Sequence, residues 1–135
     1  MSLEIQQREH EGITIIDLTG RLTAGPEATA FRDKIAALIA AGTRSVVLNL
    51  ARVDYIDSTG LGALVMSATS MRRHDGAVKL LKLTRRSIQL LVMTKLATVF
   101  EIFNDEQDAV NSFYPDRKIK TFDILDFVQK MKDED

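Results

Sequence analysis

Tyr55-Ile56-Asp57-Ser58-Thr59-Gly60-Leu61-Gly62 stands between a strand pattern and a helix pattern. The apolar run at 45–50 before it predicts a strand. After it, apolar residues recur at steps of three and four, which predicts an amphipathic helix. These residues are Leu61, Leu64, Val65, Ala68 and Met71. The chain therefore changes from strand to helix at Asp57.

The residues at this junction suit the start of a helix. Backbone N–H groups are unpaired there and the local field is positive, so the position favours a phosphate group. Ser58 or Thr59 can cap the helix, and Gly60 and Gly62 let another surface come close because they lack side chains. Two interpretations follow: a well-formed helix start and nothing more, or a functional site that includes Asp57.

The segment before the junction predicts a hairpin and a helix. Residues 3–8 and 12–18 have strand patterns, and His10-Glu11-Gly12 forms the turn between them, so an antiparallel hairpin should open the chain. Pro26 suits the first turn of a helix, and Gly42 suits the end of that helix. This helix returns the chain to the sheet.

The later segments predict alternating strands and helices. The run at 45–50 is apolar with one interruption, as expected for a central strand that helices cover on both faces. Strand patterns follow at 78–83 and 99–102, with helices predicted after Thr84 and after Asp105. This order predicts an α/β fold, a single domain with a mixed β-sheet, about four helices and right-handed crossovers.

The pattern breaks at Pro115, so we expect one domain over residues 1–114 and a C-terminal extension over residues 115–135. The extension should form an additional amphipathic helix, either packed on its own domain or used as a homodimer or partner contact. Its apolar stripe would contain Phe122, Leu125, Val128 and Met131, with Ile124 and Phe127 beside it.

Composition narrows the classes of function. With 135 residues and 45% hydrophobic content, the chain suits one globular domain with a real core. Its net charge of -1 shows no excess of basic residues, so direct nucleic-acid binding is not expected. The absence of cysteine fits a reducing compartment. Without a leader or an apolar run near the ~18 residues of a membrane span, we expect a soluble cytoplasmic protein.

The motif Asp57-Ser58-Thr59-Gly60-Leu61-Gly62, preceded by Val46-Val47-Leu48-Asn49-Leu50, resembles the signature of the STAS domain of bacterial anti-sigma-factor antagonists. The resemblance extends over residues 3–113 and includes Leu18-Thr19-Gly20-Arg21-Leu22 and Lys82-Leu83-Thr84. It implies a STAS-like domain that binds protein partners and is not an enzyme.

The resemblance also implies a phosphorylation switch. In the family, an anti-sigma factor that is itself a serine kinase phosphorylates the first hydroxyl after the Asp, which is Ser58 here, with Thr59 as the alternative. The dephosphorylated form binds that kinase and releases the sigma factor, and a separate protein phosphatase reverses the step. No catalytic residue, cofactor or metal is implied in this chain. The implied partner-binding residues are Asp57, Ser58, Thr59, Gly60, Leu61, Gly62 and Thr23.

The charges near this motif depart from the family pattern. Many relatives carry acidic residues in the first loop where this chain has Arg21 and Thr23, which leaves the identity of the partner open. Several basic residues gather in the later sequence and are interpreted as a solvated rim, or as residues that hold an acidic surface of the kinase. They are Arg72, Arg73, Lys79, Lys82, Arg85 and Arg86.

Other chemistry is weakly supported by the sequence. His10 and His74 fall in predicted turns without spaced ligand partners, so they are interpreted as surface residues and no metal site is expected. Asp54 and Asp57 are a poor pair of acid catalysts, since Asp54 lies in a linker. A nucleotide-binding enzyme is therefore the weaker alternative. The nearer one is a STAS subunit of a transporter or stress-sensor complex that has no kinase cycle.

Overall fold

The chain opens with an antiparallel hairpin, as predicted. In the computed structural model, which describes residues 3–134, β1 (Leu3–His10) pairs with β2 (Ile13–Leu22). Glu11 and Gly12 form the turn with φ values of 51° and 87°, the left-handed geometry that a two-residue hairpin loop requires. His10 is therefore the last residue of β1 and faces Ile13, so its predicted place in the turn is wrong.

Three parallel strands complete the sheet. They are β3 (Ser45–Ile56), β4 (Ala77–Leu81) and β5 (Ile102–Phe103). In the described part of the chain the strand order is β1-β2-β3-β4-β5, and the β1–β2 pair is the only antiparallel one. The predicted mixed sheet with a central strand after residue 45 is therefore confirmed. The last strand begins at Ile102 and not at Val99 as predicted.

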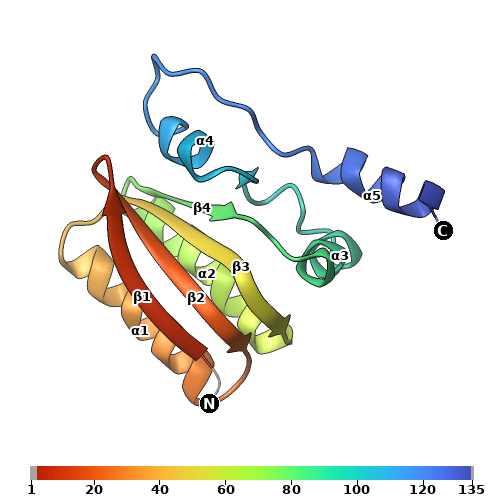
Figure 1. Ribbon diagram of the computed structural model, residues 1–135. Coiled ribbons are helices and arrows are strands. Elements are labelled where there is room, and N and C mark those ends of the chain that lie inside the picture. The colour runs from red at the N-terminus through yellow and green to blue at the C-terminus, as the bar shows by residue number, and fades with distance from the viewer. Residues whose placement is uncertain (1–2, 135) are drawn as a thin grey trace.

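The described residues form five helices, which matches the prediction of about four plus a C-terminal one. They are α1 (Pro26–Ala40), α2 (Ser58–Arg73), α3 (Arg85–Met93), α4 (Glu106–Asn111) and α5 (Ile124–Glu134). Figure 1 shows α1 and α2 side by side behind one face of the sheet, with α3 beyond the end of β4. The alternation of strand and helix patterns thus predicts the architecture correctly.

Two apolar clusters lie on opposite faces of the sheet. The larger one joins β2, β3 and β4 to α1, α2 and α3, and includes Ile16, Phe31, Val46, Leu48 and Leu64. The smaller one lies under α4 and includes Ile15, Val47, Leu81, Phe103 and Val110. Successive side chains of a strand point to opposite faces, which is why Val47 and its neighbours on either side divide between the clusters.

The second face of the sheet is only partly covered, which corrects the prediction that helices cover the central strand on both faces. Helix α4 has six residues and shields Val47, but the next residue on that face, Asn49, is only half-buried. Its amide Nδ2 donates a 2.8 Å hydrogen bond to Asp17 Oδ1. A short helix cannot span the length of the strand, so polar pairs occupy the rest of this face.

Strand β3 extends six residues beyond its predicted end. It pairs with β4 only as far as Asn49, but it remains paired with β2 until Ile56 faces Leu22. The second half of the strand contains several polar residues, among them Tyr55, so a hydrophobicity pattern does not predict it as a strand. The consequence is that β3 projects past β4 and delivers Asp57 to the end of the sheet.

The C-terminal extension packs on its own domain. Figure 1 shows α5 beside α3, and Ile124 and Met131 are buried in that contact. The Phe122 N–H donates to the Ile102 carbonyl at 3.1 Å, which ties the segment before α5 to β5. Leu125 is 57% exposed, so its predicted place in the buried stripe is wrong. A homodimer through α5 stays a prediction.

Candidate functional site

Asp57 fixes the turn between β3 and α2. It is the N-cap residue of α2, and its Oδ1 accepts a 2.8 Å hydrogen bond from the Gly60 N–H. Its Oδ2 accepts a second 2.8 Å bond from the Ala24 N–H, so one carboxylate ties α2 to the loop after β2. These backbone donors, Ala24 first and Gly60 next, lower the pKa of Asp57. The carboxylate therefore stays ionised at neutral pH and orients the turn.

The two hydroxyls after Asp57 do not cap the helix. The prediction that Ser58 or Thr59 caps α2 is wrong, because the helix begins at Ser58 and the Asp57 carboxylate already accepts the bond from the first turn. Thr59 is half-buried, whereas Ser58 is exposed. Within residues 3–134 the Ser58 hydroxyl makes no hydrogen bond. It is therefore open to solvent at the start of α2.

The two glycines of the motif have different surroundings. A Cβ built on Gly60 would lie 2.0 Å from the backbone oxygen of Leu22, so Gly60 allows the domain's own β2 to approach α2. A Cβ on Gly62 would meet no atom of the described residues within 4 Å, and Gly62 is exposed. Only Gly62 is therefore available to a surface from another molecule.

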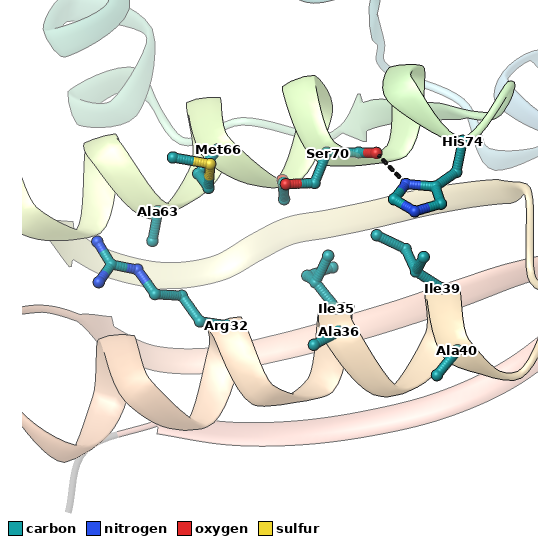
Figure 2. A pocket seen from close by; sticks show the side chains of 10 residues that line it. Arg32, Ile35, Ala36, Ile39, Ala40, Ala63, Met66, Ser70 and His74 are labelled. Carbon is teal, nitrogen blue, oxygen red and sulfur yellow. Dashed lines mark hydrogen bonds between the residues drawn. The ribbon is translucent and has the colours of Figure 1, made fainter.

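An exposed stripe runs along α2 from the Ser58 hydroxyl. Ser58, Gly62 and Met66 lie one turn apart on the same side of the helix, and Met66 is 51% exposed. The stripe leads into an apolar groove of about 480 Å³ between α1 and α2, which Figure 2 shows. The groove is lined by residues that include Ile35, Ala36, Ile39, Ala63, Met66 and His74. Polar and apolar surface thus adjoin along one helix.

The remaining predicted partner-binding residues differ in their accessibility. Thr23 is half-buried, and the Ala24–Asp57 hydrogen bond holds its loop against the turn at the start of α2. Leu61 is only 7% exposed and belongs to the core. The structure therefore brings Thr23 and Ser58 together at one end of the sheet, while Leu61 supports the helix from inside.

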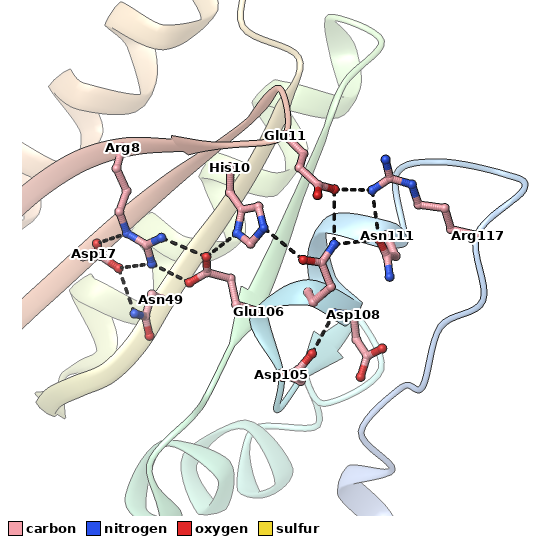
Figure 3. A network of polar contacts seen from close by, with 11 residues as sticks. Arg8, His10, Glu11, Asp17, Asn49, Asp105, Glu106, Asp108, Asn111 and Arg117 are labelled. Atoms are coloured by element: carbon pink, nitrogen blue, oxygen red, sulfur yellow. Dashed lines mark hydrogen bonds and ion pairs between the residues drawn. The ribbon is translucent and has the colours of Figure 1, made fainter.

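A polar network on the partly covered face of the sheet has no counterpart in the sequence analysis. Arg8 Nε donates to Asp17 at 2.6 Å, and Arg8 also donates to Glu106 of α4 at 2.5 Å (Figure 3). His10 Nδ1 lies 2.5 Å from the same Glu106 carboxylate, and Nε2 lies 3.0 Å from Gln107 Oε1. His10 is therefore half-buried in an ion-pair network and is not the ordinary surface residue predicted.

The same network reaches the C-terminal extension. Arg117 donates to Glu11 at 2.5 Å and to Asn111 at 2.9 Å, and the Tyr114 hydroxyl donates to the Glu11 carbonyl. Glu11 lies 103 residues from Tyr114 and 106 residues from Arg117 in the sequence, so no local pattern indicates these contacts. The contacts hold the hairpin turn, α4 and the start of the extension together.

This network makes stability depend on pH. Donation from Arg8 lowers the pKa of Glu106 from 4.5 to about 2, so its contribution is complete above pH 4.5 and is lost as pH falls toward 2. The Glu106 carboxylate raises the pKa of His10 above 6.5, so that contribution is complete below pH 6.5 and is lost as pH rises through the raised value. The difference in melting temperature between wild type and Glu106→Gln should therefore be largest between pH 4.5 and 6.5.

Thermal unfolding across pH tests this prediction, with Glu9→Gln as the control, since Glu9 is exposed on the same hairpin and makes no ion pair among residues 3–134. Nuclear magnetic resonance titration of the His10 ring should also show its pKa falling toward 6.5 in Glu106→Gln. An unchanged His10 pKa would contradict the contact on which the prediction depends.

Of two other polar side chains, Lys79 is placed differently from its prediction, whereas His74 is exposed in the turn after α2, as predicted. Lys79 is 7% exposed, and its Nζ lies 2.9 Å from Ser112 Oγ and 3.2 Å from a Glu101 carboxylate oxygen. It therefore does not belong to a solvated rim. His74 follows the last residue of α2, and its Nδ1 lies 2.8 Å from the Ser70 carbonyl oxygen.

The chemistry available at the junction is that of an accessible hydroxyl on a rigid turn. Asp54 is exposed on β3, while both Asp57 oxygens bind backbone N–H groups. In the described part of the chain, no group of three or more His, Cys, Asp or Glu side chains is arranged to hold a metal ion. Nor does any helix within residues 3–134 have the length and apolar character needed to cross a membrane.

A family model and similar curated proteins point to the same protein family. The model of the STAS domain family matches residues 4–109. The anti-sigma-B factor antagonist of Listeria monocytogenes is 33% identical over 108 residues, which cover 78% of this chain and 91% of that protein. The anti-sigma-B factor antagonist of Bacillus subtilis is 28% identical over 102 residues, covering 76% and 92% of the two chains.

Solved structures share the fold. The anti-sigma factor antagonist SpoIIAA in its unphosphorylated form superposes with a TM-score of 0.72 at 18% identity, covering 85% of this chain and all of that one. The Bacillus cell fate determinant SpoIIAA in its phosphorylated form gives a TM-score of 0.64 at 20% identity, covering 82% of this chain and 99% of that one. These likenesses extend over nearly the whole of each solved chain.

Proposed function

We propose, from the premise that this chain belongs to the STAS domain family, that it is a cytoplasmic anti-sigma-factor antagonist controlled by phosphorylation of Ser58. In its dephosphorylated form it binds an anti-sigma factor that is a serine kinase, and the sigma factor is released. The names of relatives that cover three quarters of this chain support the first part of this proposal.

The exposed Ser58 hydroxyl is the observation that carries the switch. Its side chain is free of hydrogen bonds within residues 3–134, and the backbone beneath it is held by the two bonds to Asp57. A kinase can therefore reach the oxygen without unfolding the turn. SpoIIAA, a protein with a related fold, has been solved in phosphorylated and unphosphorylated forms, which supports a modification of this kind here.

Phosphorylation acts through charge. A phosphate adds roughly -1.5 to -2 charges at neutral pH. In the free domain the start of α2 and solvent stabilise that charge, but in a complex the phosphate would lose water beside the ionised Asp57. The complex is therefore destabilised more than the free domain, so the modification releases the partner.

The chain itself acts as the phosphate acceptor and not as an enzyme in this proposal. The kinase supplies ATP and magnesium, and a protein phosphatase removes the phosphate. Asp57 orients the turn, and the Ser58–Gly62–Met66 stripe with the loop at Thr23 forms the contact surface. We place this switch in residues 1–114 and regard residues 115–135 as an extension of the domain.

The test is phosphorylation of matched variants by the purified cognate kinase. Ser58→Ala should bind the kinase without being labelled, because the acceptor oxygen is missing, whereas Thr59→Ala should be labelled like the wild type. Intact-mass measurement and peptide mapping give the readout. Full labelling of Ser58→Ala would reject the assignment and make the half-buried Thr59 the acceptor.

Binding and ATPase measurements on the purified chain separate the alternative functions. If no serine kinase binds the purified chain and a reconstituted transporter or stress-sensor complex binds it irrespective of Ser58, then the domain is a subunit without a kinase cycle. ATP turnover by the isolated chain would instead indicate an enzyme.

A further inference from the structure

Three side chains from three different elements stack beside the proposed switch. The Arg21 Cζ lies 5.2 Å from the centroid of the Tyr55 ring, and the Arg86 Cζ lies 5.3 Å from the same centroid. Arg21 comes from β2, Tyr55 from β3 and Arg86 from the first turn of α3. We call this group the arginine–tyrosine stack.

The stack exists because β3 projects beyond β4. Within residues 3–134, β2 is the only strand that neighbours β3 past Asn49, and Arg21 of β2 faces Tyr55 in the parallel register. The space on the other side is next to α3, whose start after Thr84 brings Arg86 over the ring. Tyr55 is also only two residues before Asp57, so the stack adjoins the turn that carries Ser58.

The two guanidinium groups carry positive charge that the domain leaves largely uncompensated. Both side chains are exposed, and neither forms an ion pair among residues 3–134. The charge of Arg21 contributes to the lowered pKa of Asp57, but both Asp57 oxygens already accept backbone hydrogen bonds. The planar N–H groups are therefore free to bind an external acceptor.

We propose that the arginine–tyrosine stack is a docking site for Asp or Glu side chains of the anti-sigma factor. The inference rests on the function proposed above and adds the chemistry of the partner surface. An arginine that lies on an aromatic ring loses less side-chain freedom when it binds, and its planar fork can bind a carboxylate through two hydrogen bonds. A ring that holds two such forks therefore favours an acidic surface.

The arrangement also selects among the basic residues of the sequence. Lys79 is buried against Glu101 and Ser112 and is unavailable. Arg72 and Arg73 lie in the last turn of α2, at the opposite end of that helix from Ser58. Arg86, by contrast, lies over the Tyr55 ring near the switch, where it would meet the same partner as Ser58.

The test measures association of the full chain with the purified kinase at low (about 50 mM) and high (about 300 mM) salt. The double variant Arg21→Gln/Arg86→Gln should associate about tenfold more slowly at low salt and should lose most of its salt dependence. The matched control, Arg72→Gln/Arg73→Gln, removes the same charge from the far end of α2 and should stay within about twofold of wild type.

Two further variants make the outcome decisive. Tyr55→Leu keeps both charges but removes the ring beneath them, so it should mainly increase the dissociation rate. Ser58→Asp tests the proposed function in the same assay. If Ser58→Asp weakens binding but the double arginine variant binds like wild type, only the docking site is wrong. If Ser58→Asp also binds like wild type, the proposed function is wrong as well.

Discussion

The Ser58→Asp protein is expected to bind its anti-sigma factor about 100-fold more weakly than the wild type, a loss of about 2.7 kcal/mol. Ser58 is exposed at the first position of α2, one residue after the ionised Asp57. A second carboxylate there is tolerated in the free domain, since the positive end of a helix stabilises it. In the complex both carboxylates would lose water against one partner surface.

Two controls separate the effect of a charge at position 58 from the effect of side-chain size and from the effect of the protein's overall charge. Ser58→Asn has nearly the same size as Ser58→Asp but no charge, so it should lose much less affinity. Thr98→Asp places the same charge on an exposed residue outside the junction and should bind like the wild type. Calorimetric titration with matched melting curves gives the measurement. Equal affinities of the Ser58→Asp and Ser58→Asn proteins would contradict the electrostatic mechanism.

The Gly60→Ala protein is expected to be strongly destabilised. The added methyl group would lie 2.0 Å from the Leu22 backbone oxygen and 2.8 Å from its carbonyl carbon, contacts that no rotamer change relieves. Leu22 is the last residue of β2 and its carbonyl accepts the Asp57 N–H at 3.3 Å, so the strand cannot withdraw without breaking the junction. Overpacking of this kind costs about 3 kcal/mol, at the upper end of the usual range.

Gly62→Ala is the matched control, because it makes the same change two residues later in the same helix. No atom of residues 3–134 lies within 4 Å of its Cβ position, and alanine favours the helix over glycine by about 1 kcal/mol. Denaturant unfolding should therefore show Gly60→Ala less stable and Gly62→Ala as stable as wild type or more so. Similar midpoints for both variants would show that β2 does not lie as close to α2 as described.

The sequence predicts elements whose signals are local. The hairpin, α1, α2 and α3 follow from apolar periodicity and from residues such as Pro26 and Thr84, which act on their immediate neighbours. The second half of β3 could not be found in this way, because pairing with β2 holds it as a strand although its residues are mostly exposed. Tertiary pairing overrides the local pattern there.

The sequence predicted where the candidate residues lie in the fold, but not which contacts they make. Asp57, Ser58 and Thr23 were singled out from the motif and the resemblance, and the structure places them at one end of the sheet. The cap was assigned to the wrong residue, because three successive polar side chains can each serve and only the geometry of the strand end selects Asp57. The Arg21–Tyr55 contact depends on strand register, which the pattern at the motif does not contain.

The hydrogen bond from Phe122 to Ile102 has a consequence for solubility. A strand at the margin of a sheet offers unpaired carbonyl and N–H groups to which a second molecule can add its own strand, the first step of aggregation. Here the terminal strand has two residues, and the chain's own tail occupies one of those carbonyls. The opposite margin, Leu3–His10, carries exposed charged side chains along its length. Both margins are thereby protected against addition of a foreign strand.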